Sequence, residues 1–145
     1  MGAKHSIHIR RPVEDVFAVL TNVELTGRWY PARVKEWWTS EPPHGVGSTR
    51  RARVWVMGRA MENDAVVTAH DPPRLAAMKG TSRSAPFEVT LTFEPEGDGT
   101  RVGVESAFQL QGLMKLVAPI FVSSYERGWR RGLANLKRMM EAGEL

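Results

Sequence analysis

The last third of the chain, residues 112–143, is the feature that most constrains its fold. Apolar side chains recur there at the spacing of an α-helix and gather on one broad face, which predicts a long amphipathic helix. With a rise of about 1.5 Å per residue, this helix would be long enough to cross a small domain. The predicted apolar face consists of Leu113, Leu116, Val117, Ile120, Phe121, Trp129, Leu133, Leu136 and Met140.

Three residues inside this segment say more about its packing. Gly128 and Gly132 lie on the apolar side. Glycine inside a helix costs about 0.5–1 kcal/mol relative to alanine, so this pair predicts close approach of another part of the chain, such as its backbone. Pro119 lacks a backbone N–H, so it should either kink the helix or mark where its regular part begins. We expect the helix to lie across the concave side of a sheet formed by the remaining residues.

The composition excludes several classes of protein. The 145 residues suit a single domain spanning 1–145, and the absence of cysteine excludes disulfides and thiolate metal sites. We expect a cytoplasmic protein, because no stretch has the length and apolarity of a signal peptide or a membrane span. The net charge of +4 is spread along the chain, so we expect no nucleic-acid binding.

The N-terminal part predicts a strand and two short helical segments. Residues 5–10 alternate apolar and polar side chains, as in a half-buried strand. A helix is expected from Pro12 to about Asn22, and a second short helix or turn through Leu25, closed by Gly27.

From residue 34 onward the alternation predicts six strands joined by short turns, which makes neighbouring strands antiparallel. The fold class is therefore α+β with one curved sheet and a long C-terminal helix. The expected strands are residues 34–40, 49–57, 60–70, 74–80, 87–94 and 102–110.

Five short motifs, in this order and spacing, resemble the START-like (SRPBCC) helix-grip superfamily, most closely its polyketide cyclase/dehydrase branch of small bacterial proteins, so the resemblance implies a bacterial source. The resemblance covers nearly the whole chain and implies a seven-stranded antiparallel sheet that grips the long helix, two short helices between the first two strands, and an apolar cavity. Members include lipid and polyketide carriers, aromatase/cyclases and hormone receptors. The motifs are PVEDVF (12–17), GRWYP (27–31), GVGST (45–49), DPPR (71–74) and LANLK (133–137).

Large apolar side chains are the candidates to line such a cavity, although each could equally be an ordinary core or surface residue. Trp55 and Met57 share a strand face with Arg51 and Arg53, so either that face is solvated or the cavity contains arginines. The candidate ligand-binding residues are Trp29, Trp37, Trp55, Met57, Met78, Phe108, Phe121 and Tyr125.

Few residues are candidates for a catalytic role. Tyr125 could orient a carbonyl or act as a weak acid, and His70 could act as a base if it faces inward. The resemblance implies arginine and tyrosine in the cavity of cyclase members, for which Arg53 and Tyr125 are the nearest matches. Glu36 could also face inward. For each of these residues a purely structural role is the alternative.

No cofactor or metal is expected. The four histidines lack metal-ligand spacing, and the glycines of residues 45–47 precede a strand rather than a helix, so they predict a turn and not a phosphate site.

Three functions remain open at the level of sequence. The first is binding or transport of a hydrophobic small molecule, and the second is a cyclase/dehydratase reaction on a polyketide-like substrate. The third is an accessory role through a protein or membrane surface, for which a weak membrane contact could use the basic side of the long helix, unless that side is simply solvated. The oligomeric state, monomer or homodimer, stays open. The basic side carries Arg127, Arg130, Arg131, Lys137 and Arg138.

Overall fold

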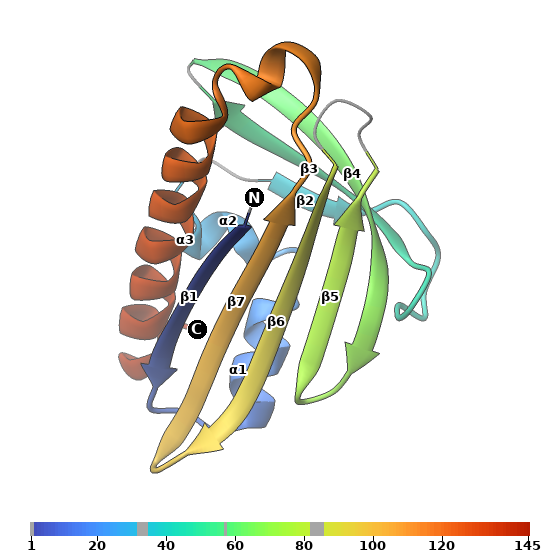
Figure 1. Cartoon of the computed structure of the whole chain (residues 1–145). Coiled ribbons are helices and arrows are strands. Elements are labelled where there is room, and N and C mark those ends of the chain that lie inside the picture. Colours follow the sequence, from blue (N-terminus) through green and yellow to red (C-terminus); the bar gives the residue numbers. More distant parts are fainter. Residues whose placement is uncertain (1, 32–34, 57, 82–85) are drawn as a thin grey trace.

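A computed structural model of the chain describes residues 2–31, 35–56, 58–81 and 86–145. The predicted order of elements is confirmed: one strand, two short helices, six strands and a long helix (Figure 1). The elements are β1 (Gly2–Ile9), α1 (Val13–Leu20), α2 (Thr26–Trp29), β2 (Lys35–Trp38), β3 (Thr49–Val56), β4 (Arg59–Asp71), β5 (Leu75–Gly80), β6 (Phe87–Glu96), β7 (Gly99–Phe108), the 3-10 turn η1 (Gly112–Lys115) and α3 (Ala118–Glu141).

All seven strands form one antiparallel sheet in the order β1-β7-β6-β5-β4-β3-β2. Strands that follow each other from β2 to β7 are neighbours, as their short connections require. The turn between β6 and β7 uses Gly97 at a φ of +56°, a conformation that favours glycine. Because β1 and β2 occupy opposite edges, the segment containing α1 and α2 has to pass from one edge of the sheet to the other.

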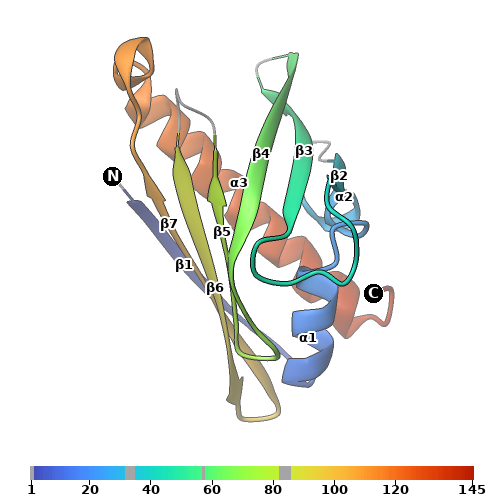
Figure 2. The same cartoon turned by 90° about the vertical axis from the view of Figure 1, so that its right-hand side faces the viewer.

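The helices lie on one side of this curved sheet, and α3 runs diagonally across it (Figure 2). The C-terminal half of α3 buries Leu133, Leu136 and Met140, which are at most 1% exposed. They form one hydrophobic cluster with α1 and with the inner faces of β1, β6 and β7. This arrangement confirms the expected helix-grip architecture.

The beginning of the long helix differs from the prediction. Residues 112–115 form the separate turn η1, and α3 starts at Ala118 with Pro119 in its first turn. A missing N–H costs nothing there, since the first N–H groups of a helix have no partner within it. Pro119 therefore marks the start of the helix rather than a kink.

The predicted apolar face is consequently wrong at its N-terminal end. Leu113, Leu116 and Ile120 are 83%, 79% and 66% exposed, and Val117 is 43% exposed. The error arose because apolar residues lie on both sides of this segment, and periodicity does not tell which side is buried.

Two smaller boundaries also differ. The first strand begins at Gly2 rather than at residue 5, and the second short helix starts after Leu25 and contains Gly27 rather than ending there. Among the described residues, no helix combines the length and apolarity needed to cross a bilayer.

Candidate functional site

The most unusual residue on the inner face of the sheet is Arg50, whose side chain is only 6% exposed. It shares this face of β3 with buried Ala52, while Arg51 and Arg53 point to the outer face and are exposed. Its guanidinium donates from Nη1 to Oδ1 of Asn63 at 2.8 Å and from Nη2 to the sulfur of Met78 at 3.0 Å.

Glu36 on the edge strand β2 supplies the countercharge. Its Oε2 lies 3.1 Å from Nε of Arg50, and its side chain is 11% exposed. The hydroxyl of Thr26 donates to its other oxygen at 2.6 Å. The N–H on Nε of Arg50 is buried and does not point at an acceptor among the described residues, so the pair balances charge but leaves one strong donor unused.

Burial lowers the pKa of the Arg50 guanidinium, and the carboxylate of Glu36 opposes that effect. Because free arginine titrates above pH 12, the side chain remains a cation at neutral pH. The inner face of the sheet therefore holds a positive charge that is shielded from water.

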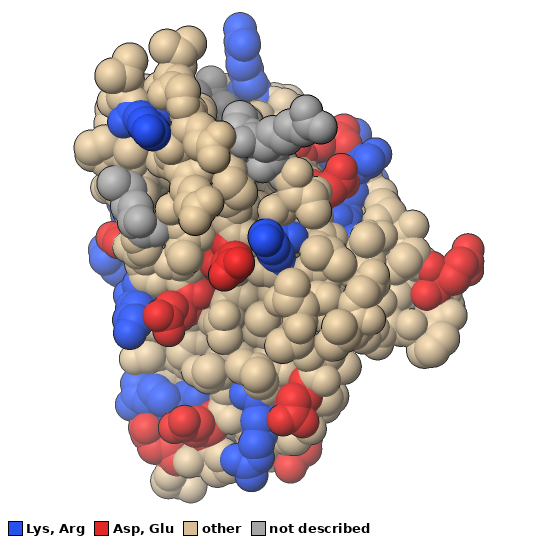
Figure 3. Space-filling model, turned by 45° about the vertical axis from the view of Figure 1, so that its right-hand side comes forward, with Lys and Arg blue, Asp and Glu red and all other residues tan. Residues whose placement is uncertain are grey.

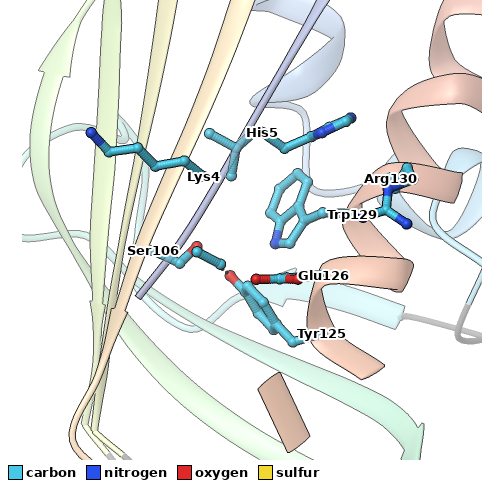
Figure 4. A pocket seen from close by; sticks show the side chains of 9 residues that line it. Lys4, His5, Ser106, Tyr125, Glu126, Trp129 and Arg130 are labelled. Atoms are coloured by element: carbon cyan, nitrogen blue, oxygen red, sulfur yellow. Dashed lines mark hydrogen bonds between the residues drawn. The ribbon is translucent and has the colours of Figure 1, made fainter. Parts of the chain in front are cut away.

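Two tyrosines belong to the same interior region. The Tyr125 hydroxyl of α3 lies 2.8 Å from Oγ of Ser106 on β7 (Figure 4). Burial raises the pKa of Tyr125, while its hydrogen bond to Ser106 and the charge of Arg50 oppose the rise. Burial also raises the pKa of Tyr30, with a further contribution from Tyr125. Both hydroxyls stay neutral and can donate hydrogen bonds.

Apolar side chains surround these polar groups. The ring of Phe108 packs edge-on against Tyr125 at 4.6 Å and against Phe121 at 5.5 Å between centroids. Trp29 is 2% exposed and packs beside Trp129 at 6.0 Å. Its indole N–H is buried and has no hydrogen-bond partner in the described part of the chain. The region thus combines aromatic walls with several polar groups, an arrangement typical of small-molecule sites.

A pocket of about 30 Å³ reaches this region along the seam between β1 and α3. Figure 4 shows that Ser106 and Tyr125 turn their hydroxyls toward each other there. A volume of this size accommodates one or two water molecules and no larger ligand. The pocket is lined by Ala3, Lys4, His5, Val104, Ser106, Tyr125, Glu126, Trp129 and Arg130.

A second recess of about 270 Å³ is open and lined by Arg10, Arg11, Asp98 and Glu141. The carboxylate of Glu141 already accepts the backbone N–H of Arg10 at 2.9 Å and Nζ of Lys137 at 2.7 Å. This charged recess does not resemble a site for an apolar ligand.

Three predicted site residues lie on the outer face of the sheet. Arg53 is paired with Glu62 at 3.1 Å, and its guanidinium lies 5.9 Å from the ring centroid of Trp37. Trp55 is 44% exposed. The face of β3 that carries Arg53 and Trp55 is therefore the solvated one, and the arginine in the interior is Arg50.

His70 also lies apart from the tyrosines. It is near the end of β4 and exposed, with its ring 5.7 Å from that of Phe17 in α1. Met57 lies outside the described residues. Five predicted residues lie in the interior, in two hydrophobic clusters: Trp29 and Met78 belong to one, and Phe108, Phe121 and Tyr125 to the other.

Sequence reasoning missed Arg50, Tyr30, Asn63 and Ser106. Arg50 alternates with Ala52 and Val54, a pattern that places an arginine on the more apolar face of its strand. No group of three or more potential metal ligands occurs in residues 2–31, 35–56, 58–81 and 86–145.

Comparison with known proteins identifies relatives of this fold. A family model described as polyketide cyclase / dehydrase and lipid transport matches residues 2–141. No curated protein matches the chain.

Several solved structures are similar. TTHA0849 from Thermus thermophilus is 17% identical, with a TM-score of 0.83 and all of both chains covered. DR_A0006 from Deinococcus radiodurans is 16% identical, with a TM-score of 0.73 over 99% of this chain and 98% of that one. The Aha1 dimer from Colwellia psychrerythraea is 18% identical, with a TM-score of 0.72 over 100% of this chain and 99% of that one. At these identities the likeness shows the fold alone.

Proposed function

The chain belongs to the polyketide cyclase / dehydrase and lipid transport family, and on that premise we propose that its interior binds an apolar small molecule carrying one hydrogen-bond-accepting or anionic group. The apolar body of the ligand would lie among Trp29, Phe108 and Phe121, and its polar group would meet Arg50 and Tyr125. The protein would act as a carrier or sensor.

One observation carries this proposal: Arg50 is a buried cation with an unused N–H donor. Removing a charge from water costs several kcal/mol, and one buried carboxylate repays this cost only with good hydrogen-bond geometry. A ligand oxygen near Nε would supply the acceptor that Glu36 does not provide. The buried N–H of Trp29 is a second donor of the same kind.

Binding requires the interior to open, because the pocket beside Tyr125 has room only for water. Met78, whose flexible side chain contacts Arg50, is one group that can move aside. Ligand binding should therefore be accompanied by displacement of side chains between the sheet and α3.

Two fluorescent probes test the proposal. The aromatic sulfonate 1-anilinonaphthalene-8-sulfonate is an anion, and N-phenyl-1-naphthylamine has a similar ring system without the charge. We expect native protein to bind both, and Arg50→Gln to weaken binding of the sulfonate by roughly tenfold while affecting the neutral probe little, since charged hydrogen bonds contribute about 1.5–3 kcal/mol.

Arg53→Gln is the matched control, because it removes the same side chain from the opposite face of the same strand. Circular dichroism at the assay temperature establishes that each variant is folded, and Tyr125→Phe provides a milder change in the same interior. Equal weakening by Arg50→Gln and Arg53→Gln, or failure of native protein to bind either probe, would contradict the proposal.

A cyclase-type reaction is the second candidate, favoured by the convergence of a buried cation with Tyr125. The enol carbon of the substrate would attack a ketone carbon of the same chain while the Tyr125 hydroxyl donates its proton to the ketone oxygen; Arg50 would stabilise the resulting tyrosinate, which takes up the enol proton. The raised pKa of Tyr125 makes it a poor proton donor, which favours binding over catalysis. Incubation with a linear poly-β-ketone thioester separates the two: turnover lost in Tyr125→Phe supports an enzyme, and binding without turnover supports a carrier.

A further inference from the structure

Four exposed aliphatic residues cluster at one end of the molecule. Leu113, Leu116, Val117 and Ile120, here called the apolar tip, lie in η1, in the two residues that follow it and in the first turn of α3. Figure 1 shows this segment, in orange, beyond the ends of β5, β6 and β7, at the same end of the molecule as the β3–β4 hairpin. Leu113 and Leu116 keep 83% and 79% of their surface exposed. Soluble monomers rarely leave a contiguous apolar patch uncovered unless it has a function.

The fold does not need these side chains for its core. The inward side of the same segment supplies Met114, Phe121 and Val122, which pack with Phe108 and Leu110. Farther along α3 the outward positions are instead charged and exposed, as at Arg127 and Arg131. The apolar character of the outward side is thus confined to the tip.

The stretch of sequence that contains the tip carries charge of a single sign. The sequence holds no acidic residue between Glu105 and Glu126, and Lys115 is exposed within η1. In Figure 3 the upper left of the molecule, where this segment lies, carries uncharged surface and basic groups, while acidic groups lie lower or to the right. Such a surface complements an anionic apolar boundary.

We propose that the apolar tip inserts into an anionic lipid surface. The exposed side chains of the tip are all aliphatic, whereas protein interfaces favour tyrosine, tryptophan and arginine. Leucine and isoleucine partition into the acyl region, and a lysine beside them is attracted to anionic headgroups. This proposal goes beyond ligand binding and does not depend on it.

Insertion of the tip into a membrane would also affect the interior of the protein, because the tip lies next to it. Met114 and Phe121 lie next to the tip in sequence, and they pack, as Tyr125 does, against the cluster that contains Phe108. Docking at this end would bring one wall of the interior next to the hydrocarbon.

Vesicle flotation tests the proposal with the full chain. We expect binding to vesicles of equal parts phosphatidylcholine and phosphatidylglycerol, and weaker binding to phosphatidylcholine alone. The double variant Leu113→Ser/Leu116→Ser should lose roughly tenfold or more in affinity, because two exposed leucines no longer transfer into lipid. Lys115→Gln should lose about fivefold, and only with the anionic vesicles.

Val46→Ser is the matched control, because Val46 is 69% exposed but lies in the loop between β2 and β3. Its vesicle affinity and melting temperature should equal those of native protein. The chain contains no cysteine, so Leu116→Cys and Val46→Cys each carry a single environment-sensitive label. Only the label at residue 116 should shift to the blue when vesicles are added.

Three outcomes would overturn the proposal. Native protein could fail to float with either vesicle, or the double serine variant could float as well as native protein. Analytical ultracentrifugation could also show a native dimer that the double serine variant converts to a monomer, in which case a second copy of the chain covers the tip. Probe binding in the interior is measured in a separate assay. A negative vesicle result therefore does not contradict the ligand proposal, and a negative probe result does not contradict membrane insertion.

Discussion

The Tyr30 side chain lies directly against Gly128 of α3: a Cβ atom added at residue 128 would fall 2.5 Å from the tyrosine hydroxyl oxygen. One added at Gly132 would lie 3.1 Å from the same ring and 3.2 Å from Trp29. The two helix glycines therefore accommodate the aromatic pair that follows α2. Close approach was predicted from the glycines, but side chains rather than a backbone make it.

Gly128→Ala should destabilise the protein by up to about 2 kcal/mol. Alanine gains about 1 kcal/mol in helix propensity, but overpacking against a buried ring costs about 1–3 kcal/mol. Urea unfolding measures the difference. Adding Tyr30→Phe removes the nearest atom and should restore part of the loss. Ala134→Gly, at an exposed position of α3, measures the contribution of helix propensity alone. If Gly128→Ala is more stable than native protein by that full amount, the steric explanation is refuted.

The buried ion pair predicts a non-additive mutant cycle. Arg50→Met leaves the Glu36 carboxylate buried without its cation and should cost about 3–5 kcal/mol. Combining it with Glu36→Gln should cost less than the sum of the single changes, because neither charge is then left alone. Arg53→Met removes an exposed pair with Glu62 and should cost less than about 1 kcal/mol. Strict additivity at Arg50 and Glu36 would argue against the pairing.

The two tyrosines of the chain predict an unusual alkaline titration. Burial raises the pKa of both above the ordinary 10.0. A raised folded-state pKa contributes stability that is complete below pH 10.0 and decreases as the pH rises toward the folded pKa. Ultraviolet absorbance should therefore show no tyrosinate in native protein just above pH 10.0, and both tyrosines should ionise together with unfolding. Early ionisation of one tyrosine would show that its hydroxyl is accessible to water.

The contacts of Glu141 predict the opposite dependence of stability on pH, in the acid range. The hydrogen bond from Lys137 and the backbone N–H of Arg10 lower the pKa of Glu141 below its ordinary 4.5. A lowered folded-state pKa contributes stability that is present above pH 4.5 and is lost as the pH falls through the folded pKa. Glu141→Gln should thus be less stable than native protein near neutrality, and the difference should vanish in acid. Glu24→Gln removes an exposed carboxylate and should leave the free energy of unfolding near neutrality close to that of native protein.

The fold was largely predictable because alternation and turn residues specify strand order locally. Two features could be established only from the three-dimensional structure. The start of α3 was misplaced because residues 113–122 are apolar on both sides, so periodicity fitted a helix that begins too early. Arg50 was missed because alternation separates the faces of β3 without saying which is buried. Its partners Glu36 and Asn63 come from neighbouring strands, whose register the sequence does not specify.

The polar groups of the interior come from α2, β2, β3, β4, β7 and α3, so the distance in sequence between Thr26 and Tyr125 spans most of the chain. No much shorter stretch of the chain contains the whole cluster. A nascent chain emerging from the ribosome would therefore assemble this cluster only after its final helix had docked.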